Sequence, residues 1–190
     1  MAAKSSFKNM TLCLLTICLV CSALLALVSQ LTAAPIADAQ QNKTNATLAQ
    51  VLPDFDKAEL RMVTVDGTDF VCYEAKADTS VVGYAVISSV IGFGGTLQLM
   101  VGFDAEGKVW STSVLSHSET PGLGANCVNP AFKDQFDRFD PSAKVLQVRK
   151  DGGDIDAITA STITSRAYCK AVEQACRIYQ LLAVMEESHE

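Results

Sequence analysis

A chain of 190 residues with 49% hydrophobic side chains has room for one membrane segment and one domain that buries its own core. Its formal net charge of −6 argues against a nucleic-acid partner, because phosphate backbones bind basic surfaces. Two distant histidines, and four cysteines outside the N-terminal apolar run that show no CxxC or metal-ligand spacing among them, argue against a metal site. We expect the four cysteines outside the N-terminal region to be free, buried thiols: Cys72, Cys127, Cys169 and Cys176.

An uncharged apolar run is the first predicted element. No charged side chain lies between Lys8 and Asp38, and about 20 apolar residues are enough to cross a bilayer. Lys4 and Lys8 precede the run, so the positive-inside rule predicts a cytoplasmic N-terminus over residues 1–8. We therefore expect a single transmembrane anchor over residues 9–34, in the inner membrane, with the rest of the chain on the periplasmic side.

A cleaved signal peptide is the alternative for this run, with Ala37-Asp38-Ala39 as its small-x-small site. The run exceeds the 7–15-residue apolar core of a signal peptide, which favours a retained anchor. Fifteen basic residues less the two N-terminal lysines leave thirteen against twenty-one acidic ones, a net charge of −8. An acidic domain of this kind is not suited to holding anionic lipid headgroups by charge.

The chain after the anchor predicts a tether and then a folded domain. Residues 35–50 are small and polar and indicate a tether that becomes helical near its end, with the domain over 51–190. Four segments dense in β-branched and aromatic residues predict strands, at residues 69–76, 81–88, 96–104 and 108–116. In the third of these, apolar residues alternate, which predicts one buried face: Leu97, Leu99, Val101 and Phe103.

Helical spacing dominates the last part of the sequence. Residues 130–139 predict a short helix, 144–149 a further strand, and 164–185 an amphipathic helix. The apolar stripe of that last helix is made by Tyr168, Val172, Ala175, Tyr179 and Leu182. Strands grouped before a terminal helix predict an α+β domain with a largely antiparallel sheet and a C-terminal helix, rather than a parallel βαβ array.

Two short tracts carry the functional information. The first is Glu119-Thr120-Pro121-Gly122-Leu123-Gly124, directly after a predicted strand, and the second runs from Asp156 through Thr162 into the terminal helix. Glycines and small hydroxyl residues beside a helix N-terminus suit a bound phosphate, because the first turn offers unpaired N–H groups and the positive end of the helix dipole. If no ligand binds here, the hydroxyl groups would cap the helix and Pro121-Gly122 would form a turn.

Together, behind a membrane segment, these tracts resemble the FMN-carrying G subunit of the Rnf electron-transport complexes and the related C subunit of the sodium-pumping NADH:quinone reductase. Members of this family carry Asp, two variable residues, Ser or Thr, usually Gly, Ala, and then the flavin-bearing Thr. The pattern falls here on Asp156, Thr159, Ala160, Ser161 and Thr162. Ala160 replaces the usual Gly and Ser161 the usual Ala, so Ser161 adds a second hydroxyl beside the acceptor.

The resemblance implies FMN joined to Thr162 by a phosphoester, with no catalytic residue and no metal in this chain. It implies further flavin contacts from both tracts, at Thr159, Ala160, Ser161, Glu119, Thr120, Gly122, Leu123 and Gly124. A separate flavin transferase would attach the cofactor. The implied function is electron transfer within a membrane complex that couples ferredoxin:NAD⁺ redox chemistry to ion translocation, alongside other membrane subunits of an Rnf-type complex.

Three alternatives share parts of this pattern. The short chain favours the Rnf protein over the longer C subunit of the sodium pump. A stand-alone extracytoplasmic flavoprotein serving another redox chain would carry the same two tracts. A membrane-anchored binding domain without redox chemistry would use both tracts only as structure, and the absence of flavin colour would identify it.

Overall fold

The computed structural model describes residues 7–65, 67–78 and 80–187, and the chain divides into two compact units, one up to Lys43 and one from Thr44. Helix α1 (Phe7–Val51) is continuous over 45 residues. Among the described residues it is the one helix long and apolar enough to cross a membrane, with a mean hydropathy of 2.7 over its most apolar window. It fits a single-pass anchor.

The tether was expected to be helical only near its end, and this prediction is wrong, because α1 runs through residues 35–50 without a break. The segment is polar, but it is rich in Ala and Gln, which favour a helix. Its end is also held by burial: Leu48 and Val51 pack in the core of the second unit. The polar side chains of residues 35–50 therefore belong to an exposed helix and not to an irregular segment.

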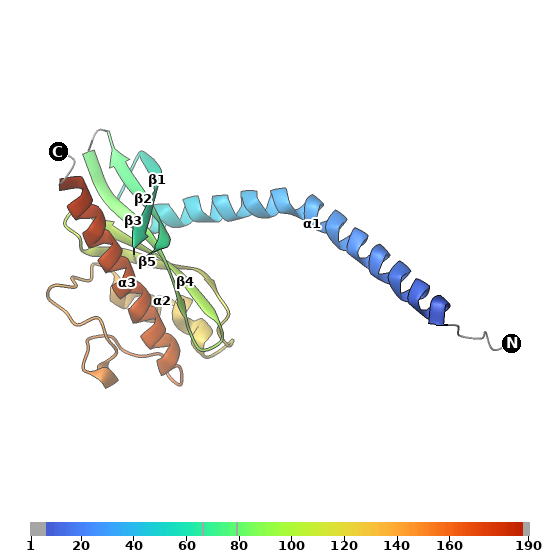
Figure 1. Cartoon of the computed structure of the whole chain (residues 1–190). Helices are drawn as coiled ribbons and strands as arrows, with labels where there is room; N and C mark the ends of the chain where they lie inside the picture. The colour runs from blue at the N-terminus through green and yellow to red at the C-terminus, as the bar shows by residue number, and fades with distance from the viewer. Residues whose placement is uncertain (1–6, 66, 79, 188–190) are drawn as a thin grey trace. The chain divides into compact units, whose positions relative to one another are not determined.

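The second unit contains, within the described residues, a five-stranded antiparallel sheet in the order β1-β2-β3-β4-β5 (Figure 1). The strands are β1 (Lys57–Val65), β2 (Thr68–Ala77), β3 (Ser80–Ile91), β4 (Thr96–Asp104) and β5 (Val109–His117). The four predicted strands are confirmed as β2 to β5. Strand β1 escaped prediction because it is an edge strand with charged residues at alternate positions and exposed Leu60 and Met62.

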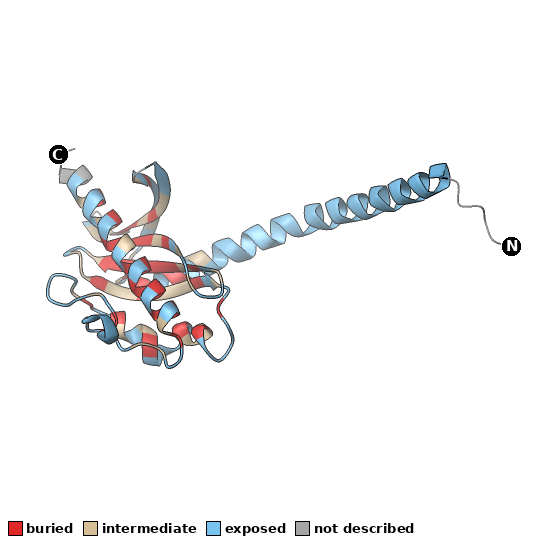
Figure 2. Cartoon of the chain, turned by 60° about the horizontal axis from the view of Figure 1, so that its bottom comes forward, coloured by how far each residue is buried: buried red, intermediate tan, exposed pale blue. Residues whose placement is uncertain are grey.

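Helix α3 (Thr162–Glu187) covers one face of this sheet, as Figure 1 shows. Its stripe of Tyr168, Val172 and Ala175 is fully buried against the alternating apolar residues of β4, which confirms both sequence patterns. Buried residues follow the side of α3 that faces the strands (Figure 2). The domain is therefore α+β, as predicted.

The opposite face of the sheet is covered by the last turns of α1. Leu48, Val51 and Leu52 pack there with Met100 and its neighbours in a second core cluster. The approach is so close that a Cβ at Gly102 would overlap the carbonyl of Val51. Both faces of β4 are consequently buried, which fixes the strand between two helices.

The segment between β5 and α3 is mostly irregular. The predicted helix over 130–139 is confirmed only in part, as α2 (Pro130–Lys133) and the 3₁₀ turn η2 (Asp134–Phe136), preceded by the 3₁₀ turn η1 (Gly124–Val128). Aromatic contacts hold it to α3: the ring centroids of Phe136 and Tyr168 are 4.7 Å apart. The chain then returns to the sheet, where the Val109 N–H donates to the Phe139 carbonyl.

The predicted strand over 144–149 is wrong. The segment forms a single parallel bridge, Val148 to Ile155, and ends in the 3₁₀ turn η3 (Arg149–Asp151). Its side chains have strand propensity, but Phe139 already pairs with the start of edge strand β5, and the segment turns back at Gly152 (φ 89°). Because the segment pairs with the returning chain at Ile155, it has no neighbouring strand with which to form a longer ladder.

The four cysteines of the domain are free and buried, which confirms the prediction. Burial raises the pKa of each thiol: to about 12 at Cys72 and Cys169, and to about 11 at Cys127 and Cys176. All four are therefore neutral near pH 7 and act as small apolar side chains.

Candidate functional site

The two tracts singled out in the sequence meet at the start of α3. Between them lies a half-open cleft of about 360 Å³. Its lining residues are Phe93, Glu119, Thr120, Leu123, Gly124 and the five residues from Ala160 to Thr164. The remaining two predicted residues, Thr159 and Gly122, line an adjoining cavity of about 480 Å³ that shares Leu123 and Ala160 with the cleft. The fold thus brings together all nine predicted residues, from segments some forty positions apart.

A tight turn delivers the second tract to the helix. The Ser161 N–H donates to the Ile158 carbonyl at 3.0 Å, and Ala160 has φ 59°. A positive φ at this position of a turn favours glycine, and an L-residue there costs on the order of 1 kcal/mol. The replacement of the usual Gly by Ala therefore keeps the turn at some cost in backbone strain.

Helix α3 begins at the cleft. The Ser161 carbonyl accepts the first helical hydrogen bond, from the Ser165 N–H at 3.0 Å, so Ser161 is the N-cap residue and Thr162 the first helical residue. The N–H groups of the first turn have no acceptor within a helix, and no side chain described in the structure caps them. No Lys or Arg lines the cleft. An anion here would be held by backbone N–H groups and the helix dipole.

The hydroxyl groups of this helix start differ in their surroundings. Thr164 Oγ1 is buried and donates to Glu119 Oε2 at 2.9 Å. Ser165 Oγ is fully buried, donates to the Ser161 carbonyl and accepts from the Ile158 N–H. Ser161 is 8% exposed, whereas Thr162 is half-buried at the cleft, and its hydroxyl bonds to none of the residues that the structure describes. Thr162 therefore presents the most accessible unpaired hydroxyl of the helix start.

Glu119 is a buried carboxylate, 5% exposed, at the floor of the cleft. Its oxygens accept from the Phe93 N–H (2.8 Å), the Gly94 N–H (3.4 Å) and the Thr164 hydroxyl (2.9 Å). A Cβ at Gly124 would overlap both Glu119 Oε2 and Thr164 Oγ1, so this glycine permits the contact. The carboxylate joins three segments of the chain, a role that the sequence did not indicate.

Phe93 lines the cleft and was not predicted. It sits in the turn between β3 and β4 with 68% of its surface exposed, although it is a large aromatic side chain. Leu123 and Ile163, which are 43% and 52% exposed, complete an apolar rim around the cleft. The one signal in the sequence is an aromatic residue inside the glycine-rich turn Gly92-Phe93-Gly94-Gly95, where no strand face exists to bury it.

Asp156 begins the second tract outside the cleft. Its carboxylate pairs with Arg149 at 2.8 Å, and its backbone N–H and carbonyl both bond to the side-chain amide of Gln135, at 2.7 and 3.2 Å. Two bonds to one amide fix the entry of the turn.

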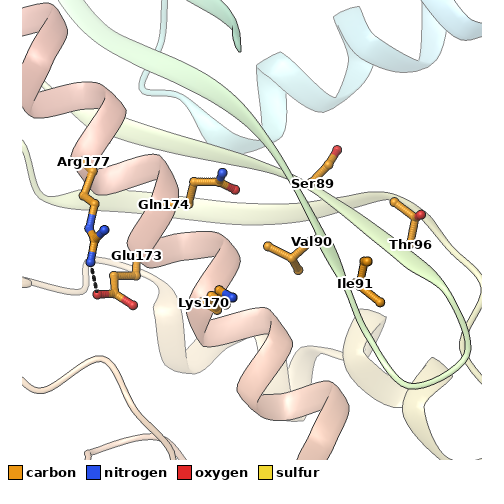
Figure 3. Close-up of a pocket in the computed structure, with 8 residues that line it drawn as sticks. All are labelled: Ser89, Val90, Ile91, Thr96, Lys170, Glu173, Gln174 and Arg177. Atoms are coloured by element: carbon orange, nitrogen blue, oxygen red, sulfur yellow. Dashed lines mark hydrogen bonds and ion pairs between the residues drawn. The ribbon is translucent and has the colours of Figure 1, made fainter. Parts of the chain in front are cut away.

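A separate cavity of about 470 Å³ lies between β3 and α3 (Figure 3). Its charged side chains lie on α3, where Arg177 pairs with Glu173 at 3.0 Å, and Gln174 accepts from Ser88 at 2.7 Å. It contains no residue of the two tracts. Within the described ranges, no group of three metal-binding side chains is present.

Comparison with known proteins gives two family matches. The FMN-binding domain matches residues 92–177, and the RnfG N-terminal region matches residues 1–51. The G subunit of the proton-translocating ferredoxin:NAD(+) oxidoreductase complex of Clostridium ljungdahlii is 35% identical over 172 residues, which cover 88% of this chain and 86% of that protein. The G subunit of the ion-translocating oxidoreductase complex of Methanosarcina acetivorans is 33% identical over 181 residues, 92% and 95% of the two chains.

Among solved structures, the C subunit of the Na(+)-translocating NADH-quinone reductase from Parabacteroides distasonis is similar, with 18% identity and a TM-score of 0.48. The match covers 68% of this chain and 77% of that one.

Proposed function

Because the chain belongs to the family of G subunits of the ion-translocating oxidoreductase complexes, we propose that it carries electrons on an FMN bound in the cleft at the start of α3. The observation that carries this proposal is the convergence of both sequence tracts on one cleft, which is lined by the uncapped start of a helix and by exposed apolar side chains. FMN has a matching division into an anionic phosphate and an apolar ring system.

We assign Thr162 as the attachment point, through a phosphoester to its hydroxyl. Thr164 donates its hydroxyl to Glu119, and Ser165 bridges two backbone groups, so neither is available without breaking buried bonds. Ser161 is nearly buried. A phosphate on Thr162 would lie next to the free N–H groups of the first helical turn, which stabilise its charge.

The remaining predicted residues have supporting roles. Gly122 supplies the left-handed backbone of the first tract (φ 76°), Gly124 lets that tract lie close to Thr164 at the helix start, and Thr120 and Leu123 line the cleft itself. FMN supplies redox chemistry that accepts and donates electrons singly or in pairs. The protein supplies the position of that group and its electrostatic surroundings.

The wider assignment follows the family. We propose that the anchor places the domain on the periplasmic face of the inner membrane, since Lys4 and Lys8 precede the apolar run and the rest of the chain is acidic. A separate flavin transferase would attach FMN, since the sequence places no base close to Thr162 and the family pattern implies such an enzyme. Other subunits of an Rnf-type complex would exchange electrons with the flavin and couple ferredoxin:NAD⁺ redox chemistry to ion transport.

Intact mass of the full chain purified from its native host tests the attachment. We expect the mass of one FMN on the wild type and on Ser161→Ala, and none on Thr162→Ala, which keeps its fold because a small residue replaces another small residue at the helix start. Flavin fluorescence in a denaturing gel should follow the same pattern. Covalent flavin on Thr162→Ala would refute the assignment of Thr162, and a wild type without any flavin would refute the proposed function.

A further inference from the structure

The described part of the cleft contains two residues whose arrangement goes beyond attachment of the phosphate. We infer that Phe93 is the side chain that packs against the flavin ring, and that Glu119 is a positioning residue that holds Phe93 at the cleft. The inference rests on the proposed function, because it concerns the ring of the same FMN. It assigns Glu119 a role through Phe93, instead of the direct flavin contact expected from the sequence.

The exposure of Phe93 is the first observation. A phenylalanine with 68% of its surface in water loses most of the stabilisation that burial would give, about 25 cal/mol per Å² of apolar surface. Ile163 and Leu123 stand exposed on the other lining segments of the same cleft. An apolar rim around a polar helix start suits a ligand that is apolar at one end and anionic at the other. Of the three rim side chains, only Phe93 offers an aromatic face for stacking.

The hydrogen bonds of Glu119 are the second observation. Its carboxylate accepts the backbone N–H of Phe93 itself, at 2.8 Å, and the Thr164 hydroxyl two residues after the proposed attachment point, at 2.9 Å. One buried side chain therefore sets the spacing between the turn that carries Phe93 and the turn that carries Thr162. Charge-assisted bonds of this kind are the stronger ones in proteins, so the spacing is well defined.

Steric constraints on the same turn agree with this role. A Cβ at Gly92 would overlap Glu119 Oε1, and a Cβ at Gly94 would overlap the Ser118 carbonyl. Both glycines flank Phe93, so the chain keeps side chains away on either side of it and lets the turn lie directly on the Glu119 tract. A turn that served only to connect β3 and β4 would not require this approach.

Flavin fluorescence, measured per bound flavin on the full chain, tests the role of Phe93. A stacked tryptophan quenches flavin emission by donating an electron, whereas phenylalanine is too hard to oxidise to do so; we therefore expect Phe93→Trp to lower the emission several-fold and Phe93→Ala to shift the midpoint potential. Ile91→Trp is the matched control: Ile91 is 84% exposed on the same hairpin, but lines the other cavity. It should leave both readouts unchanged.

Glu119 is tested by a pair of variants. Both are made in the Phe93→Trp background, where Glu119→Ala should restore the emission, while Glu119→Gln, which keeps an oxygen acceptor for the backbone N–H of residue 93, should keep most of the quenching. Far-UV circular dichroism checks that each variant is folded. If Glu119→Ala does not fold, the comparison of Glu119→Gln with unaltered Glu119 in the same background decides: unquenched emission in a folded Glu119→Gln would refute the positioning role.

The failure of this inference differs from the failure of the proposed function. Covalent flavin on the wild type together with unquenched emission in Phe93→Trp and an unchanged potential in Phe93→Ala would overturn the role of Phe93 and leave the function intact. A wild type that carries no flavin would overturn the function, and this inference with it.

Discussion

Replacement of Gly124 by alanine probes the contact on which the site depends. The added Cβ would overlap Glu119 Oε2 and Thr164 Oγ1, which are hydrogen-bonded to each other at 2.9 Å. Overpacking of a well-packed site costs about 1–3 kcal/mol, and weakening a hydrogen bond to a charged group about 1.5–3 kcal/mol. We expect a loss of about 3 kcal/mol, which lowers the Tm by roughly 6–12 °C for a chain of this size.

Gly122→Ala is the matched control, because it separates backbone strain from overlap. Gly122 has φ 76° and no heavy atom within 4 Å of an added Cβ, whereas Gly124 is not in the left-handed region. An alanine at Gly122 introduces about 1–2 kcal/mol of left-handed strain, offset in part by about 0.4–1 kcal/mol through the unfolded chain. The net loss is therefore about 1 kcal/mol.

The assay is thermal unfolding of the full chain in detergent, followed by circular dichroism on protein made without flavin transferase, so that cofactor loading does not contribute. Gly124→Ala should lower the Tm at least twice as far as Gly122→Ala. Equal shifts for the two variants would refute the reasoning, since they would mean that Glu119 moves aside at little cost and does not tie the cleft together.

Three further predictions follow from the turn, the thiols and the anchor. Ala160→Gly should raise the Tm slightly, because it relieves the strain at φ 59°, whereas Ala183→Gly in the last two turns of α3 should lower it by the equivalent of at most about 1 kcal/mol. The buried thiols should resist iodoacetamide at pH 8 in native protein. Because burial raises their folded pKa above the ordinary value of 9.0, their contribution to stability is present below about pH 9 and falls as the pH rises toward 11–12. The free energy of unfolding in urea, measured as a function of pH, would show this loss. A phosphatase reporter fused after Glu190 should be active and a cytoplasm-dependent reporter silent; the reverse would contradict the topology.

Periodicity in the sequence predicted the parts of the fold in which one face is buried. The alternation around Leu99 and the stripe around Val172 each mark an element with a dry side, so β4 and α3 were found with accurate bounds. Strand β1 was missed because an edge strand is held by its ladder to β2 and not by burial. Residues 144–149 had the composition of a strand but no partner strand, which only the assembled fold reveals.

The same division applies to the site. The meeting of both tracts at a helix start could be expected, because small residues in a short local pattern suit a phosphate there, while Thr162 as the acceptor comes from the family resemblance and stays a prediction. The role of Glu119 depends on Phe93 and Thr164, which come from two distant turns, and no local pattern encodes their meeting. Phe93 could have been suspected only from an aromatic residue in a turn that has no face to bury it.

The position of α3 after both other lining segments in chain order determines when the cleft can exist. Phe93 and Glu119 leave the ribosome before the 26-residue helix α3, yet the cleft is completed by the first turn of that helix, which is held in place by packing along the helix up to Leu182. A nascent chain, or one truncated within α3, therefore has Thr162 without the packed surface around it. If Thr162 is the attachment point proposed above, a transferase that reads the assembled cleft would load only chains in which α3 has folded onto the sheet.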